Sequence, residues 1–177
     1  MSLRDGPVIV VSLILAPLAK VVESVAAPAT GGPDLLLVLA VCVGWLCDPW
    51  HATPAGFALG LVEDLVVARC LGSRAIPLAI AALLAGSLKS ILSPESLSSK
   101  MLAALAGSTV ADYATWGILA AKGIRIVPLY FVRSIWMPSA LWAAFLVGPM
   151  HFALMRLAAW AGSVLPPLSG KGREAVL

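Results

Sequence analysis

The carboxylates of Glu63 and Asp64 are the most unusual chemical groups in the sequence, because they lie side by side in an apolar stretch. The stretch "GFALGLVEDLVVARCLG", residues 56–72, consists mainly of Leu, Val, Ala and Gly, with Arg69 near its end. An ionised carboxylate inside a membrane is costly unless it is paired, hydrogen-bonded or close to water. The two acids therefore need partners, or a position near the end of a helix.

The glycines that precede these acids predict where Asp64 points. Gly56, Gly60 and Asp64 are spaced by four residues and share one face of a helix. Small residues at this spacing let a neighbouring helix approach closely. We therefore expect Asp64 to face a helix contact, where it fixes the packing or receives a partner. The alternative is an acid that is solvated at the end of its helix.

Asp112 is a further acid within an apolar segment, and its neighbours along the helix are polar. Ser108 precedes it by one turn, and Thr109 and Thr115 lie three residues to either side. Such a stripe can satisfy its hydrogen bonds locally, so we expect a structural role for Asp112. A ligand site or proton site is the alternative.

Four more polar residues have structural interpretations. Lys20 and Glu23 are three residues apart and are expected to form an interfacial ion pair. Asp34 opens an apolar segment, as acids at helix N-termini do. His151 lies among apolar residues and is expected to be a buried structural histidine.

Sequence motifs of common enzymes are absent. The chain has no His-Glu-x-x-His, no Gly-x-Ser-x-Gly, no phosphate-binding loop and no Gly-x-Gly-x-x-Gly. The two histidines, His51 and His151, are not spaced as metal ligands. The remaining alternative is that the fold brings them together with Glu63 or Asp64, as a metal site or as the active site of an intramembrane hydrolase. The sequence predicts a protein that is not an enzyme and that has no cofactor and no metal.

The composition indicates an integral membrane protein. Of the 177 residues, 60% are hydrophobic and only 12% are charged, which leaves too little polar surface for a soluble domain. The net charge of +3 comes from basic residues that are scattered singly, so a nucleic-acid partner is not expected. The lipid bilayer is the expected surrounding.

Pro, Gly and charged residues divide the chain into six apolar segments. Their polar residues should turn inward, which predicts an all-α fold, a compact bundle of six transmembrane helices over residues 1–165 with a short polar tail at 166–177. The last segment is too long for one straight crossing, so we expect a kink at Pro138 or Pro149, or first turns along the interface. The segments cover about residues 7–25, 34–50, 54–70, 75–92, 99–121 and 129–165.

Two motifs at a fixed separation resemble those of a known family, the bacterial rod shape-determining protein MreD. The first is a Pro-Asp-Leu-Leu-Leu opening, and the second is Gly-Leu-hydrophobic-x-Asp-Leu, followed by Leu-Gly seven and eight residues after the Asp. The matching positions are Pro33, Asp34, Leu35, Leu36 and Leu37, then Gly60, Leu61, Asp64 and Leu65, then Leu71 and Gly72.

The resemblance implies a non-catalytic membrane subunit of the cell-elongation machinery. Such a subunit would bind an MreC-like single-span protein and work alongside the MreB filament, RodA and its transpeptidase in peptidoglycan synthesis. It also implies a fold similar to the substrate-binding subunits of energy-coupling-factor transporters, in the bacterial inner membrane with both termini in the cytoplasm. The expected partner-docking face consists of Gly56, Gly60, Glu63, Asp64, Arg69 and Gly72, with Asp34 and Asp112 as structural polar residues.

A small-solute-binding subunit of an energy-coupling-factor-type transporter is the alternative function. Subunits of that class generally carry an Ala-x-x-x-Ala motif on the first helix for docking the coupling component. No such motif occurs between Pro7 and Ala27, which counts against this alternative.

Overall fold

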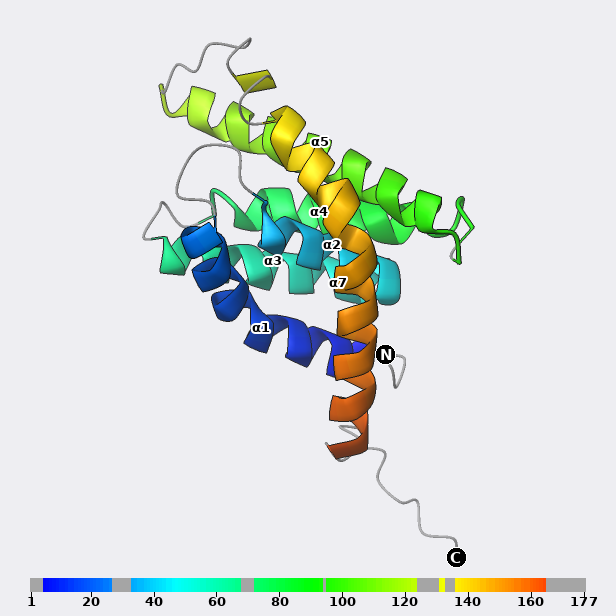
Figure 1. Cartoon of the computed structure of the whole chain (residues 1–177). Coiled ribbons are helices and arrows are strands. Elements are labelled where there is room, and N and C mark those ends of the chain that lie inside the picture. Colours follow the sequence, from blue (N-terminus) through cyan, green and yellow to red (C-terminus); the bar gives the residue numbers. More distant parts are fainter. Residues whose placement is uncertain are drawn as a thin grey trace, which may run out of the picture.

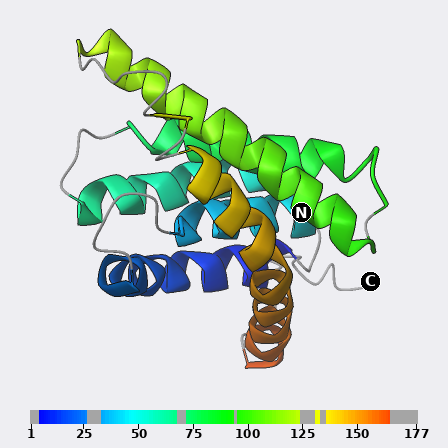
Figure 2. The same cartoon turned by 45° about the horizontal axis from the view of Figure 1, so that its top comes forward.

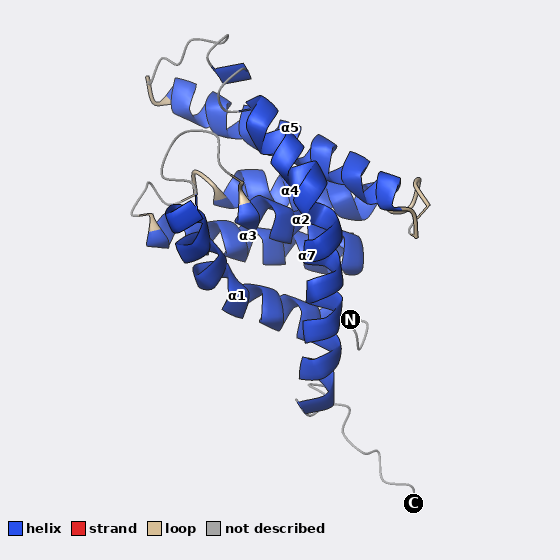
Figure 3. Ribbon diagram, in the orientation of Figure 1, coloured by secondary structure: helices blue, strands red, loops and turns tan. Residues whose placement is uncertain are grey.

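Helices are the regular secondary structure of the described residues. The computed structural model describes residues 5–26, 33–67, 72–93, 95–123, 131–132 and 136–164, and no strand occurs among them. Figures 1 and 3 show the arrangement of the helices. The predicted all-α class is confirmed. The helices are α1 Asp5–Ala26, α2 Leu35–Leu46, α3 Pro49–Val66, α4 Ala75–Leu88, α5 Leu97–Ala121 and α7 Met137–Val164.

Helix α2 is the centre of the bundle. It is apolar on all sides, and its residues 36–45 are all buried. It contacts α1, α3, α4, α5 and α7, as a helix without a polar face must. Asp34 caps its N-terminus and accepts a hydrogen bond from the Leu37 backbone N–H at 3.0 Å. The role predicted for Asp34 at a helix start is therefore confirmed.

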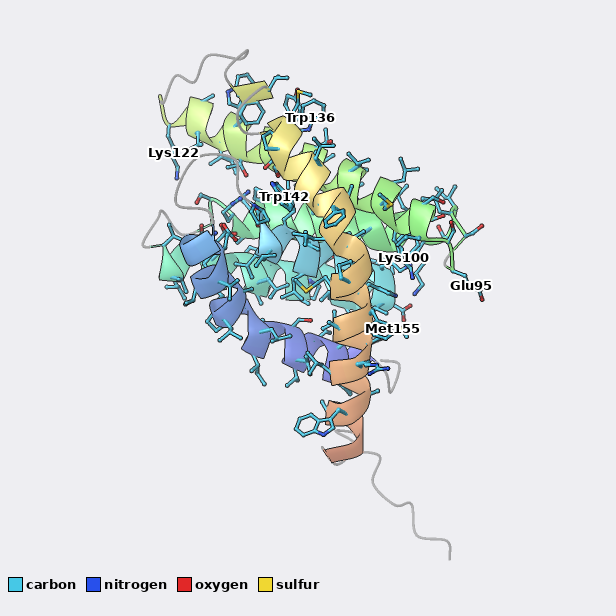
Figure 4. The ribbon with its side chains drawn as sticks, viewed as in Figure 1. Glu95, Lys100, Lys122, Trp136, Trp142 and Met155 are labelled. Carbon is cyan, nitrogen blue, oxygen red and sulfur yellow. The ribbon has the colours of Figure 1, made fainter. Side chains whose placement is uncertain are left out.

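The helices around α2 run in different directions. In Figure 2, α1, α2 and α3 run alongside one another, α5 slants across one side of them, and α7 extends away from the bundle toward its C-terminal end. The charged residues labelled in Figure 4 mark the two ends of α5, with Glu95 and Lys100 near one end and Lys122 at the other.

The helix starts that differ most from the sequence prediction are those of α3 and α7. Helix α3 begins at Pro49 and not near Pro54, because Pro at the first helical position lacks an N–H that would be unpaired there anyway. Helix α7 begins at Met137, well after residue 129, and residues 133–135 before it lie outside the described residues. Pro149 lies inside α7.

Helices α3 and α4 pack closely on one another. A Cβ atom built on Gly60 would lie 2.4 Å from the Ala75 Cα atom and 2.6 Å from the Arg74 carbonyl oxygen. A Cβ atom on Gly56 would lie 2.7 Å from the Leu78 carbonyl oxygen. The predicted close helix approach at these glycines is present, and the neighbouring helix is α4 of the same chain.

Two of the described helices are long and apolar enough to cross a membrane by length and composition, over residues Asp5–Glu23 and Met137–Ala161. Helices α2 and α4 are apolar but shorter. Six crossings therefore remain a prediction. Many large apolar side chains lie on the outside, including Ile14 and Leu18 on α1 and Phe145 on α7, which is 70% exposed. A surface of this kind suits lipid.

Substitution of Gly60 by Ala should destabilise the bundle by about 2 kcal/mol or more, because the new methyl group meets backbone atoms that cannot rotate away. Gly117→Ala on α5 is the matched control, since a Cβ atom there meets nothing within 4 Å. The control should leave stability unchanged or raise it by up to about 1 kcal/mol. Unfolding by SDS in mixed micelles measures both. Equal stability of the two variants would contradict the close packing of α3 on α4.

Candidate functional site

Arg74 is the centre of a buried ion network. It lies in the turn before α4 and reaches three helices through its guanidinium group. Nη2 pairs with Asp34 Oδ2 at the start of α2, and Nε donates to Glu63 Oε1 of α3 at 3.2 Å. Nη1 lies 3.9 Å from Asp112 Oδ1 and donates to Thr115 Oγ1 at 3.4 Å, both on α5. One side chain thus joins α2, α3, α4 and α5.

Lys20 extends this network to α1. Its Nζ atom lies 2.7 Å from Glu23 Oε1 and 3.0 Å from Glu63 Oε1. The predicted Lys20–Glu23 pair is confirmed. The contact with Glu63 also joins α1 to α3, which local spacing in the sequence could not predict. The same Glu63 oxygen also pairs with Arg74, so that Glu63 connects the two cations of the network.

The network holds more carboxylates than cations. Two cations, Lys20 and Arg74, face four carboxylates, those of Glu23, Asp34, Glu63 and Asp112. Among the described residues, one oxygen each of Glu23, Glu63 and Asp112 is buried without a hydrogen-bond partner. Burial lowers the pKa of Arg74, but Asp34, Glu63 and Asp112 together raise it further, so its pKa lies above the ordinary value and Arg74 stays charged.

Asp64 lies outside the ion network and accepts hydrogen bonds from the turn that precedes α4, residues 72–74. It is only 1% exposed and accepts hydrogen bonds from Gly72 N–H at 2.7 Å and from the Ser73 hydroxyl at 2.9 Å. The Arg74 N–H also donates to both carboxylate oxygens, at 3.2 and 3.3 Å. Gly72 has a φ of +92°, a conformation that favours glycine. Asp64 therefore fixes the turn that places Arg74 in the network.

The described residues of the expected docking face contact other parts of the same chain. Gly56 and Gly60 pack on α4, Glu63 belongs to the ion network, and Asp64 and Gly72 form the turn. Arg69 lies outside the described residues. A partner helix would have to displace α4 to reach the glycines, and a partner-docking role of these residues stays a prediction.

Asp112 also differs from its predicted local stripe. Ser108 and Thr109 donate to the Leu105 carbonyl oxygen, and Thr115 donates to that of Ala111. These polar neighbours thus donate to backbone carbonyls of their own helix and not to Asp112, which faces Arg74. A structural role is the one this geometry supports.

Sequence reasoning missed Arg74 as a site residue. Its partners Asp34 and Asp112 belong to other helices, and Asp34 is 40 residues away in the sequence. The sequence did contain one signal for it. Several acids in apolar segments need a basic residue close to them, and Arg74 is near the ends of those segments. The arrangement ties helices together and offers no nucleophile with a neighbouring base among the described residues of the network.

Replacing Arg74 by Gln should destabilise the fold by about 3–5 kcal/mol, because it leaves buried carboxylates without their cation. Arg156→Gln is the control, since Arg156 lies on the exposed surface of α7 beside the Phe152 ring. Unfolding in mixed micelles gives both values. The double variant Arg74→Gln with Glu63→Gln should be less destabilised than the sum of the two single variants. If the two losses in the free energy of unfolding simply add, a direct ion pair is wrong.

Replacing Asp64 by Ala should cost about 1–2 kcal/mol or more, because three donors at the start of α4 lose their acceptor. The matched variant is Ser96→Ala, since Ser96 is the N-cap of α5 and its side chain makes no capping hydrogen bond. Thermal unfolding in detergent compares the two. If Ser96→Ala lowers the melting temperature as much as Asp64→Ala does, the capping role of Asp64 is wrong.

Comparison with known proteins identifies the family. A family model for the rod shape-determining protein MreD matches residues 6–159. No curated protein and no solved structure shows significant similarity to the chain, so the expected likeness to energy-coupling-factor subunits stays a prediction. The matched region contains all six described helices up to residue 159, including the ion network and the α3–α4 turn. The chain therefore belongs to the rod shape-determining protein MreD family, whose members are membrane proteins of the bacterial cell envelope.

Proposed function

We propose that the chain is a non-catalytic membrane subunit of the bacterial cell-elongation complex. It binds an MreC-like single-span protein and helps to organise peptidoglycan synthesis by RodA and its transpeptidase, alongside MreB. The observation that carries the proposal is the family match over residues 6–159, because the family acts in rod shape determination. The proposal also places the chain in the inner membrane with both termini in the cytoplasm.

The chemistry of the described residues supports a subunit that acts by binding. Its buried charges serve helix-to-helix contacts and the α3–α4 turn. A buried network that joins five helices gives the bundle a defined shape, and a defined outer surface is what a partner protein needs. The predicted site residues Gly56, Gly60, Glu63, Asp64 and Gly72 enter the proposal as the support of this shape rather than as the surface that the partner touches.

The partner's membrane helix is proposed to pack on α7. This helix has 28 residues, and Figure 1 shows its C-terminal part reaching beyond the rest of the bundle. Leu141, Phe145 and Phe152 are exposed and follow one helical stripe, with Trp142 beside it. A helix that leaves its own bundle can be covered by a second helix, and close packing drives such association in lipid.

Co-purification tests this proposal. Replacing Leu141, Phe145 and Phe152 together by Ala should reduce capture of the tagged MreC-like protein at least tenfold, because the packing surface is lost. The matched control replaces Ile14, Leu18 and Val22 of α1 by Ala, since these side chains are also exposed and apolar. It should retain capture. Both variants keep an apolar surface, so both should still insert and fold.

The possible failures are distinct. If the unaltered chain does not capture the MreC-like protein, the proposed function is wrong. If the α7 variant captures as much as the α1 variant, the function stands and the contact on α7 is wrong. Cells that depend on the α7 variant should also lose their rod shape and become round.

A further inference from the structure

A second group of polar side chains lies at the end of the bundle opposite the ion network. Asp5 begins α1, Asp48 is the N-cap of α3, and His51 lies in the first turn of α3. One possible ligand atom from each of them lies within 4.8 Å of the other two. Asp5 Oδ2 and His51 Nδ1 lie 3.4 Å apart.

These side chains have free coordination capacity. Asp5 is only 3% exposed, and both its Oδ2 atom and the His51 Nδ1 atom are buried without a hydrogen-bond partner among the described residues. Buried polar atoms normally have a hydrogen-bond partner, and these two have only each other at 3.4 Å, which leaves capacity for a ligand between them. Asp48 does not use its side chain to cap α3, and its carboxylate is therefore also available.

The charge of the group favours a cation. Within the described residues, neither Asp5 nor Asp48 forms an ion pair with a lysine or arginine. The N-termini of α1 and α3 offset only part of two negative charges. An imidazole nitrogen together with two carboxylate oxygens is a ligand set that suits zinc and manganese better than magnesium or calcium.

We infer that Asp5, Asp48 and His51 bind one divalent transition-metal ion, of the zinc and manganese class. His51 and Asp48 are accessible from outside, with the His51 side chain 33% exposed, so the ion can enter without unfolding the bundle. The three protein ligands leave coordination positions for water. The ion joins α1 to α3 at the end away from Lys20 and Glu63, which already join these helices at the other end.

Metal binding by the purified full-length chain tests the inference. The chain is prepared without a histidine tag, treated with a chelator in detergent, and dialysed against Zn²⁺, Mn²⁺ or Mg²⁺ alone. We expect one Zn²⁺ per chain by elemental mass spectrometry and a higher melting temperature with Zn²⁺ than without it. Mg²⁺ should bind at least tenfold more weakly than Zn²⁺.

Three variants assign the ligands. His51→Gln and Asp48→Asn should each weaken Zn²⁺ binding at least tenfold. Asp48 is exposed, so its substitution does not disturb the core. His151→Gln is the matched control, because His151 is the other histidine of the chain and lies on α7. It should bind Zn²⁺ as the unaltered chain does.

Several results would overturn the inference. Absence of stoichiometric Zn²⁺ in the unaltered chain would show that these residues bind no such ion. Equal loss in His51→Gln and His151→Gln, or equal binding of Mg²⁺ and Zn²⁺, would contradict the assigned site and metal class. Partner capture is measured separately, so this inference and the proposed function fail independently.

Discussion

Charged side chains in an apolar bundle must find their partners within the protein, and this constraint determines how the helices of this chain are arranged. Lipid cannot solvate a carboxylate or a guanidinium group, so each buried charge selects the neighbours of its helix. Arg74 meets Asp34, Glu63 and Asp112, and Lys20 meets Glu63. Through these pairs α1, α2, α3 and α5 converge on the start of α4.

The position of Arg74 depends in turn on Asp64. Asp64 receives the N–H groups of Gly72 and Arg74 and the hydroxyl of Ser73, and it thereby holds residues 72–74 against the C-terminal part of α3. Gly60 then lies against Ala75 with no room for a side chain. The two adjacent acids thus have complementary roles: Asp64 shapes the turn, and Glu63 pairs with the cation that the turn delivers.

The features that sequence reasoning predicted correctly are those that depend on local spacing. The helical period places Asp64 on the glycine face, the position of Asp34 identifies a helix start, and the Lys20–Glu23 pair is one turn apart. The role of Arg74 could not be predicted in this way, because its partner Asp34 is distant in the sequence and only packing brings them together. For the same reason the glycine face could be recognised, but not that α4 of the same chain occupies it.

The most direct test of this account is the solvent exchange of the Arg74 side-chain Nε–H, measured by NMR on arginine-labelled protein in lipid. Buried hydrogen-bonded protons exchange slowly. The account predicts that the Arg74 Nε–H exchanges at least a hundredfold more slowly than that of Arg156, which is exposed on α7. Equal exchange at the two arginines would show that Arg74 faces water, and the ion network could then not be what holds these helices together.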